Sequence, residues 1–223
     1  MSYYSTDVKG NQEATVENVE VLVDLTAPTT PTLTIAEGDF SNTGNATLSW
    51  TASTDALSGL DHYEVWRMAE RNAGLGEDHA WMQVYTTNGT SFVDTGRFSN
   101  TTYQYYIRSY DVAGNYIDSA IQTVTVDTDN PGVTIVSPTE GQMFGIQTIE
   151  VTANYANTFL VNCHAKVDGG AWQEMDGDNL VSGTATTMFL GVGDGAHNVT
   201  VECWDQAENY ASATAYDVVI DTQ

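Results

Sequence analysis

Hydrophobic and polar residues alternate with a period of two along most of this chain. Such alternation is typical of β-strands that have one face buried and the other in solvent. The clearest runs are residues 46–50, 63–67, 81–85, 101–108, 148–152, 161–167 and 195–201. The pattern therefore predicts an all-β chain.

A short turn sequence occurs three times and groups these runs into repeats. Residues 110–115 read Tyr-Asp-Val-Ala-Gly-Asn, and weaker copies occupy residues 5–11 and 204–209. Each copy is followed by a strand-like run that ends in an aspartate, which is Asp24, Asp127 or Asp221. These aspartates lie 17, 16 and 16 positions after the aspartate of their turn. A unit that recurs about every one hundred residues has the size of a domain and is too long for a solenoid repeat.

The repeats divide the chain into residues 1–28, 29–128 and 129–223. The first part holds one turn, a predicted strand over residues 14–23 and a linker in which Pro28 excludes helix. Each of the other two carries enough runs for a complete β-sandwich. A lone hairpin is marginally stable in water. We therefore expect residues 1–27 to contact an upstream half-domain, the next domain or another chain, within a longer protein.

The middle part carries residues with a more specific meaning. Trp50, the Tyr63-x-Val65 pair, Tyr103 at the start of an alternating strand, and the D-x-A-G-N turn that begins at Asp111 together resemble a fibronectin type III domain of prokaryotic surface proteins. In that resemblance Tyr103 takes the tyrosine-corner position. Residues 129–223 lack these signatures and are similar to the immunoglobulin-like repeats of large bacterial or archaeal surface proteins. The resemblance implies tandem β-sandwiches and does not by itself give a function.

Composition narrows the range of partners. The chain is 41% hydrophobic and 10% aromatic, which is enough to fill a core in each domain. Its net charge of -24 arises because 30 acidic residues face only 6 Lys and Arg. Nucleic acids and anionic membranes are bound through clustered Lys and Arg, so this composition argues against both. There is also no apolar run of the roughly 18 residues needed to span a membrane. A cation is the partner that the charge favours.

The repeated aspartates predict where a cation would bind. In an immunoglobulin-like sandwich the turn between the last two strands lies at the end where the chain enters, so each turn should face the preceding linker. Several hard oxygen ligands brought together in this way suit Ca²⁺. The predicted ligands are Asp24, Asp55, Asp61, Asp111 and Asn115 at the first junction, and Asp127, Asp129 and Asp205 at the second. The second junction offers fewer ligands, because residues 154–157 contain no carboxylate. The alternative is that the motif is a purely structural hairpin turn.

Two kinds of covalent feature are predicted. Cys163 and Cys203 lie on strand-like segments with inward parity, which favours a single disulfide and an oxidising compartment. Asn-x-Ser/Thr sequons, the glycosylation candidates, occur at Asn45, Asn88, Asn100 and Asn198. Asn88 is also the first residue of an Asn-Gly pair, which is a signal for a tight hairpin.

Strand parity places Trp66, Tyr106, Arg108 and Tyr110 on an outward face. This group is either a platform for a sugar or another partner, or a solvated face that stacks on itself through cation-π contacts. Catalytic constellations are absent from the sequence, since the four histidines are scattered and no H-E-x-x-H, G-x-S-x-G or phosphate-loop motif occurs. We therefore expect a protein that is not an enzyme.

These observations predict an extracellular stalk or spacer, of adhesin or surface-layer type, stiffened by Ca²⁺ at its junctions. Its partners would be neighbouring domains or another copy through residues 1–27, and glycans or cell-surface proteins. One alternative is an accessory carbohydrate-binding module of a secreted enzyme. Another is a filament subunit in which residues 1–27 complete a neighbour's sandwich.

Overall fold

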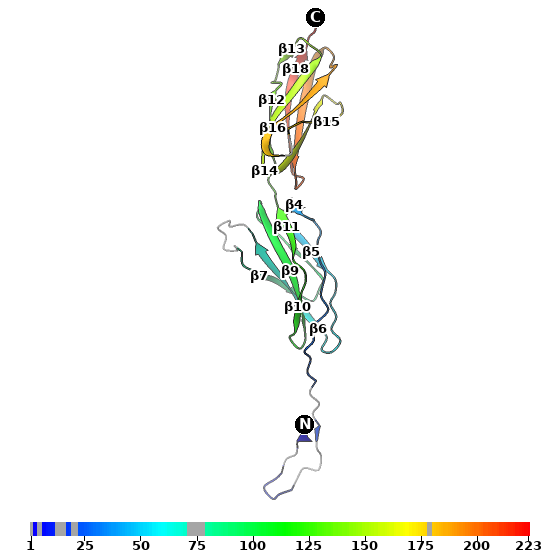
Figure 1. Ribbon diagram of the computed structural model, residues 1–223, viewed down its shortest axis with the longest axis vertical. Coiled ribbons are helices and arrows are strands. Elements are labelled where there is room, and N and C mark those ends of the chain that lie inside the picture. Colours follow the sequence, from blue (N-terminus) through cyan, green and yellow to red (C-terminus); the bar gives the residue numbers. More distant parts are fainter. Residues whose placement is uncertain (1, 4–5, 12–16, 19–21, 71–78, 178–179) are drawn as a thin grey trace.

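The computed structural model describes residues 2–3, 6–11, 17–18, 22–70, 79–177 and 180–223. The molecule is elongated, with a hairpin, a middle sandwich and a C-terminal sandwich following one another and the two termini at opposite ends (Figure 1). Every regular element in the described ranges is a β-strand, which confirms the predicted all-β class. No helix that could cross a membrane is found among these residues.

The N-terminal hairpin consists of β1 (Ser2–Tyr3) and β2 (Glu17–Asn18), which pair antiparallel as a separate two-stranded sheet. A turn at residues 7–11 lies between them. Much of the strand predicted over residues 14–23 lies outside the described residues, and its last two residues, 22–23, have no regular structure. The chain then runs without regular structure to the first strand of the middle domain.

The middle domain is a sandwich of two sheets. The smaller sheet has the order β3 (Leu33–Ile35), β5 (Ala46–Trp50) and β8 (Ser91–Asp94). The larger sheet has the order β4 (Phe40–Ser41), β11 (Gln122–Val126), β9 (Thr101–Asp111), β6 (Leu60–Ala69) and β7 (Met82–Thr87), with β10 (Tyr116–Asp118) paired to the end of β9. Alternate residues of the long strands β6 and β9 are buried between the sheets, as their period of two predicts.

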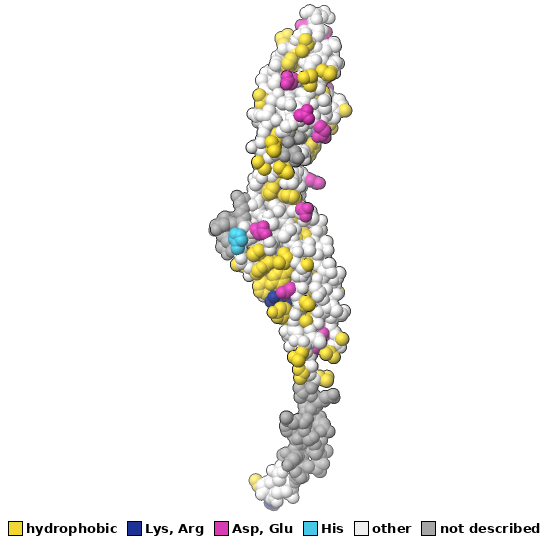
Figure 2. All heavy atoms as spheres, in the orientation of Figure 1, with side chains coloured by type: hydrophobic (Ala, Val, Ile, Leu, Met, Phe, Trp, Pro, Cys, Tyr) yellow, Lys and Arg dark blue, Asp and Glu magenta, His cyan; other side chains and the backbone are white. Residues whose placement is uncertain are grey.

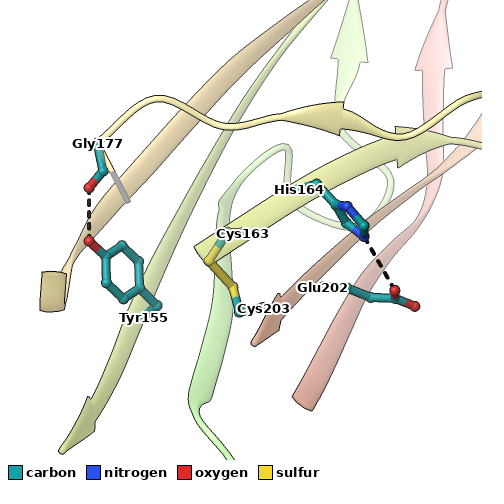
Figure 3. The surroundings of a disulfide bond; sticks show 6 residues. All are labelled: Tyr155, Cys163, His164, Gly177, Glu202 and Cys203. Atoms are coloured by element: carbon teal, nitrogen blue, oxygen red, sulfur yellow. Dashed lines mark hydrogen bonds and ion pairs between the residues drawn. A yellow bond between two sulfur atoms is a disulfide. The ribbon is translucent and has the colours of Figure 1, made fainter. Parts of the chain in front are cut away.

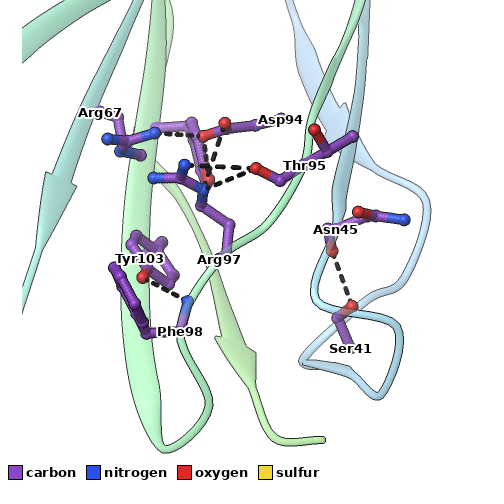
Figure 4. Close-up of polar contacts among 9 residues, drawn as sticks. Ser41, Asn45, Arg67, Asp94, Thr95, Arg97, Phe98 and Tyr103 are labelled. Atoms are coloured by element: carbon purple, nitrogen blue, oxygen red, sulfur yellow. Dashed lines mark hydrogen bonds and ion pairs between the residues drawn. The ribbon is translucent and has the colours of Figure 1, made fainter.

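The core of the middle domain is closed by aromatic residues. Trp50 packs edge-on against Tyr63, with ring centroids 5.7 Å apart. The hydroxyl of Tyr103 accepts a hydrogen bond of 3.0 Å from the backbone N–H of Phe98, five residues upstream (Figure 4). This contact is a tyrosine corner and confirms the role that the resemblance gave to Tyr103.

A buried ion pair also lies in this core (Figure 4). Arg67 Nη1 donates to Asp94 Oδ2 at 2.7 Å, and both side chains are 7% exposed. The hydroxyl of Tyr105 donates to the same oxygen at 2.9 Å. Burial, followed by the charge of Asp94, raises the pKa of Tyr105 above its ordinary range, so this residue stays a neutral donor. Asp94 therefore ties β8 of the smaller sheet to β6 and β9 of the larger one.

The C-terminal domain is organised by one long strand. β14 (Thr148–Val167) pairs with β16 (Leu180–Leu190) and β12 (Gly132–Ser137) in its first half. After a register shift between Ala156 and Val161, β14 pairs with β17 (Gly195–Asp205). The remaining strands are β18 (Tyr210–Ile220), β13 (Met143–Phe144) and β15 (Gln173–Glu174). β14 thus pairs with β12, β15, β16 and β17 within one seven-stranded sheet.

The predicted disulfide is confirmed. Cys163 and Cys203 lie directly opposite each other on β14 and β17, are fully buried and are bonded (Figure 3). They sit in the hydrophobic cluster of the C-terminal domain, among residues such as Val161, Ala165 and Val201.

The hairpin predicted at Asn88-Gly89 is wrong. This pair connects β7 to β8, and these two strands belong to different sheets. Asn88 instead donates from its side-chain Nδ2 to the carbonyl of Asp61 at 2.7 Å. The dipeptide therefore forms a corner between the layers, because both of its flanking strands find better partners elsewhere.

Candidate functional site

The three copies of the turn sequence share one geometry. In each, the backbone N–H of the first aspartate donates to the carbonyl of the asparagine four residues later: Asp7 to Asn11 at 3.0 Å, Asp111 to Asn115 at 3.0 Å and Asp205 to Asn209 at 3.1 Å. The aspartate Oδ1 accepts the backbone N–H of that asparagine in return. A carboxylate that satisfies the turn amides explains why an aspartate begins each copy.

The three aspartates that end the repeats are also equivalent. The Oδ1 atom of each accepts the backbone N–H two residues further on, which belongs to Thr26, Asp129 or Gln223. Each repeat therefore ends in a fixed bend of the backbone.

Turn and exit meet at both junctions between domains. Asn115 Nδ2 donates to the carbonyl of Asp24 at 3.3 Å, and Asn209 Nδ2 donates to the carbonyl of Asp127 at 2.8 Å. The asparagine of one domain thus holds the backbone of the linker that precedes it. We call this contact the junction clamp.

The first junction gathers three carboxylates. Asp24, Asp55 and Asp111 each offer an oxygen, and these oxygens all lie within 4.8 Å of one another. Asp111 is buried, whereas Asp24 and Asp55 are half-buried. We call these three residues the acidic triad. Hard oxygen ligands at this spacing fit a divalent cation such as Ca²⁺, and without a cation the three charges repel one another.

Hydrogen bonds hold the triad in place. Asp55 Oδ1 accepts three backbone N–H groups of its own loop, from Leu57, Ser58 and Gly59, at 2.8 to 3.0 Å. The hydroxyl and the N–H of Thr26 lower the pKa of Asp24 to about 2, so that this carboxylate is ionised at neutral pH. No hydrogen bond from a described residue reaches Asp55 Oδ2, which leaves that oxygen available to a ligand.

Two further residues were predicted at this site. Asp61 is not part of the triad, and its Oδ2 pairs with Nδ1 of the adjacent His62 at 2.7 Å. Asn115 lies at the site, where its Nδ2 donates to Asp111 Oδ2 at 2.8 Å and to the Asp24 carbonyl. That its carbonyl oxygen is a cation ligand stays a prediction.

The second junction has the same turn and exit aspartates, but amide groups surround its turn aspartate. Asp205 Oδ2 accepts Nδ2 of Asn157 at 2.7 Å, and Asp205 is also bonded by Asn209 and by the N–H of Ala207. Asp129 lies apart from this group, with its Oδ2 bonded to Nδ2 of Asn100 at 2.6 Å. Three cation ligands were expected here. Among the described residues the three-carboxylate grouping occurs only at the first junction.

Asp127 is the unusual member of the second junction. Its side chain is fully buried, and Oδ1 accepts bonds from Ser99 and Asp129. No described donor lies within hydrogen-bonding distance of its Oδ2. Burial and the nearby charge of Asp205 raise the pKa of Asp127.

The two junctions also differ in packing. At the second, Phe40 contacts Phe159 edge-on with centroids 5.4 Å apart, and Ala207 of the turn is buried. At the first, Ala113, which corresponds to Ala207, is exposed. Its neighbours Val112 and Leu57 are 65% and 70% exposed. The turn of the first junction is therefore less buried than the turn of the second.

The outward aromatic face lies on β6, β9 and β10. Trp66 and Tyr106 are nearly parallel, with an angle of 4° between rings and centroids 5.8 Å apart. Arg108 is fixed by two bonds to Asp118, at 2.7 and 2.9 Å, and its guanidinium lies 4.2 Å from the ring of Tyr116. Figure 2 shows a hydrophobic area over β9 with a basic side chain beside it. The parity prediction for this face is therefore met, and so is the expected cation-π stacking. The fourth predicted residue, Tyr110, stacks on His62 and also packs against Tyr116, the ring that Arg108 lies over.

The C-terminal domain has a similar group that sequence reasoning missed. His164 stacks on Trp172 with centroids 3.9 Å apart, meets Trp204 edge-on at 4.1 Å and pairs with Glu202 at 3.4 Å (Figure 3). Lys166 Nζ lies 4.1 Å from the Trp172 ring. Parity places His164, Lys166 and Trp204 on one outward face, and this signal could have identified the group.

The sequons lie in different surroundings. Asn88 and Asn198 are exposed, whereas Asn45 and Asn100 are half-buried. Asn88, Asn100 and Asn198 also make hydrogen bonds to Asp61, Asp129 and Asp217, respectively. Glycosylation stays a prediction, with Asn88 and Asn198 the more accessible acceptors.

Parts of two known enzymes are similar in sequence to this chain. No protein-family model matches the chain. The chain is 32% identical over 206 residues to exoglucanase B of Cellulomonas fimi, covering 87% of this chain and 17% of that enzyme. It is 25% identical over 221 residues to an alpha-amylase of Niallia circulans, covering 85% of this chain and 16% of that enzyme. The chain thus spans less than a fifth of either relative.

Among solved structures, fibronectin(III)-like modules of Clostridium thermocellum CbhA share 15% identity with this chain at a TM-score of 0.48. The match covers 85% of this chain and 94% of that chain. The strand order and the tyrosine corner carry the assignment independently of it. The chain is a tandem array of β-sandwiches of the fibronectin type III and immunoglobulin-like kind, as the sequence resemblance predicted.

Proposed function

We propose that this chain is a non-catalytic spacer of a secreted, modular protein, and that its first junction is stiffened by Ca²⁺. The observation that carries the proposal is the junction clamp, which occurs at both junctions with the same two residue types. A contact that recurs between domains fixes the direction in which one domain follows another. The disulfide and the relatives, which are named as polysaccharide-degrading enzymes, support an extracellular location.

We propose Ca²⁺ for the acidic triad because its three carboxylates lie close together and no described Lys or Arg forms a salt bridge with them. Asp111 belongs to the middle domain, Asp24 to the linker and Asp55 to the loop between β5 and β6. A cation bound by all three would join linker and domain through one coordination shell. Extracellular calcium modules bind with dissociation constants of about 10⁻⁴ to 10⁻³ M, and we expect an affinity in that range.

Calcium titration of the whole chain by calorimetry tests this proposal. Asp55→Asn removes one charge from the triad while keeping a polar side chain of the same size, and we expect it to weaken binding at least 10-fold. Asp61→Asn is the matched control, because Asp61 follows the same loop and its carboxylate faces His62 instead. Wild-type protein without calcium affinity, or equal affinities for wild type and Asp55→Asn, would contradict the assignment.

A second function is favoured by the outward aromatic face. Trp66 and Tyr106 are held parallel, Trp81 braces Tyr106 edge-on at 4.7 Å, and Arg108 is locked by Asp118. Because these side chains are already ordered, binding a sugar ring there would cost little conformational entropy. The named relatives act on glucans and starch, so the ligand proposed is a neutral polysaccharide.

Retention on insoluble cellulose, chitin and starch tests the second function. We expect Trp66→Ala and Tyr106→Ala each to lose most of the wild-type retention. Tyr216→Ala removes an exposed tyrosine of the C-terminal domain and serves as the control. If wild type is not retained on any of the three polymers, the face is a self-stacked surface that stabilises the sheet.

A further inference from the structure

The two junctions are built from three corresponding positions, which we call corners. Two corners hold the same residue types at both junctions, and the third differs. Asp24 corresponds to Asp127, because each presents its carbonyl to the clamp asparagine. Asp111 corresponds to Asp205, because each begins the turn. The third corner comes from the loop between β5 and β6 at the first junction, and from the middle of β14, where its register shifts, at the second. That corner is Asp55 at the first junction and Asn157 at the second.

The chemistry at this corner is opposite in the two junctions. Asp55 adds a third negative charge within 4.8 Å of Asp111. Asn157 instead directs its amide Nδ2 to Asp205 Oδ2 at 2.7 Å. An amide N–H donor at this distance stabilises an ionised carboxylate, as a bound cation would. Because the amide is neutral, it does not add a third negative charge to the junction.

We propose that Asn157 closes the second junction in place of a cation, so that the residue at this corner decides whether a junction binds Ca²⁺. The chain then has one calcium-dependent junction and one calcium-independent junction. For the first junction this inference rests on the proposed function. For the second it rests on the contacts of Asn157 alone.

The surroundings of Asn157 support a permanently closed junction. Asp205 accepts hydrogen bonds from Asn209 just as Asp111 does from Asn115, and in addition accepts the amide of Asn157 and the N–H of Ala207. The Phe40–Phe159 contact and the buried Ala207 add apolar packing between the domains. At the first junction Leu57 and Val112 of the matching loops are exposed instead.

Because of Asp127, one substitution is enough to give the second junction an acidic triad. Its Oδ2 is buried and receives no hydrogen bond from any described residue, so it is a carboxylate oxygen without a ligand. At the first junction the matching atom, Asp24 Oδ2, accepts the N–H of Ser58 at 3.1 Å. The longer loop at residues 51–59 supplies that donor, and the tighter connection at residues 157–160 does not. Asn157→Asp would place a third carboxylate beside Asp127 and Asp205 and complete an acidic triad.

The number of Ca²⁺ ions bound per chain, measured by native mass spectrometry and calorimetry, tests the inference. We expect one ion for wild type and two for Asn157→Asp. Asn154→Asp adds the same charge at an exposed position of β14 and should leave the number at one. Two ions bound by wild type, or no more ions bound by Asn157→Asp than by wild type, would overturn the inference. No ion for wild type with one for Asn157→Asp would remove calcium from the first junction yet uphold the role of Asn157.

A second measurement does not depend on the variant folding. Spin labels at Thr123→Cys and Ser212→Cys, both exposed, report the distance between β11 and β18 across the second junction. In wild type we expect the same narrow distance distribution with Ca²⁺ and with chelator. In Asn157→Asp the distribution should broaden with chelator and narrow again with Ca²⁺. A wild-type distribution that broadens with chelator would contradict a calcium-independent second junction.

Discussion

At the scale of single residues, buried polar groups connect the layers of each sandwich. Arg67 occupies an inward position of β6, where its charge is balanced by Asp94. A buried ion pair contributes little net stability compared with apolar residues, but removing one partner leaves an uncompensated charge in the core. Parity marks Arg67 as inward from the sequence, whereas its partner on β8 becomes evident only when the two sheets face each other.

We expect Asp94→Ala to lower the free energy of unfolding of the middle domain by about 3 to 5 kcal/mol. The reason is that Arg67 and Tyr105 lose their shared acceptor. Asp118→Ala removes the exposed partner of Arg108 and should cost about 1 kcal/mol or less. Urea unfolding of both variants measures the difference. Similar losses for the two variants would contradict a structural role for the buried pair.

The stability of the C-terminal domain should depend on pH through His197. His197 Nδ1 faces Asp168 Oδ2 and Nε2 faces the Gly193 carbonyl, each at 2.8 Å. Two acceptors favour the doubly protonated ring, and the Asp168 hydrogen bond raises the pKa of His197 above its ordinary value. The stabilisation is therefore fully present below about pH 6.5 and is lost as pH rises through the raised pKa.

At low pH, Asp168, the partner of His197, makes the domain less stable as the pH falls. The N–H of Asn198, and then His197, lower the pKa of Asp168, so its contribution is lost as pH falls through that lowered value. Thermal unfolding of the C-terminal domain at pH 5.5 and 8.5 should show a larger decrease for wild type than for His197→Gln. Equal decreases would show that His197 does not contribute.

At the scale of elements, the alternating pattern predicted most strands and missed the places where a strand changes partner. The run at residues 148–152 and the run at residues 161–167 are one strand, β14, which changes its pairing partners after Ala156. The Asn88-Gly89 corner was read as a hairpin for the same reason. Local signals describe a turn and its flanking strands, but the sheet that each strand joins is decided by packing over the whole domain.

The disulfide stabilises the C-terminal domain alone. Cys163 and Cys203 are 40 residues apart, and joining them restricts the unfolded chain. We expect the double variant Cys163→Ala, Cys203→Ala to unfold with about 2 to 4 kcal/mol less free energy. The middle domain contains no cysteine and is the internal control in the same calorimetric scan. A loss shared by both domains would show that their folding is coupled.

At the scale of the whole molecule, the sequence predicted that turn and exit aspartates meet at the junctions. It suggested that the second junction offers fewer carboxylates, and the structure places Asn157 where the first junction has Asp55. It could not distinguish Asp55 from Asp61, because both follow the same strand and only the path of the loop decides which carboxylate points to the junction. The resulting molecule is a row of sandwiches in which the first junction is open and acidic, and the second is packed and hydrogen-bonded.

The most direct test of the account is the distance distribution across the first junction. Spin labels at Val8→Cys, in the exposed turn of the hairpin, and at Thr123→Cys on the middle domain span this junction. Saturating Ca²⁺ should give a narrow distribution and chelator a broad one, and Asp55→Asn should give the broad one in both conditions. Identical distributions for wild type with Ca²⁺ and with chelator would contradict a calcium-stiffened spacer.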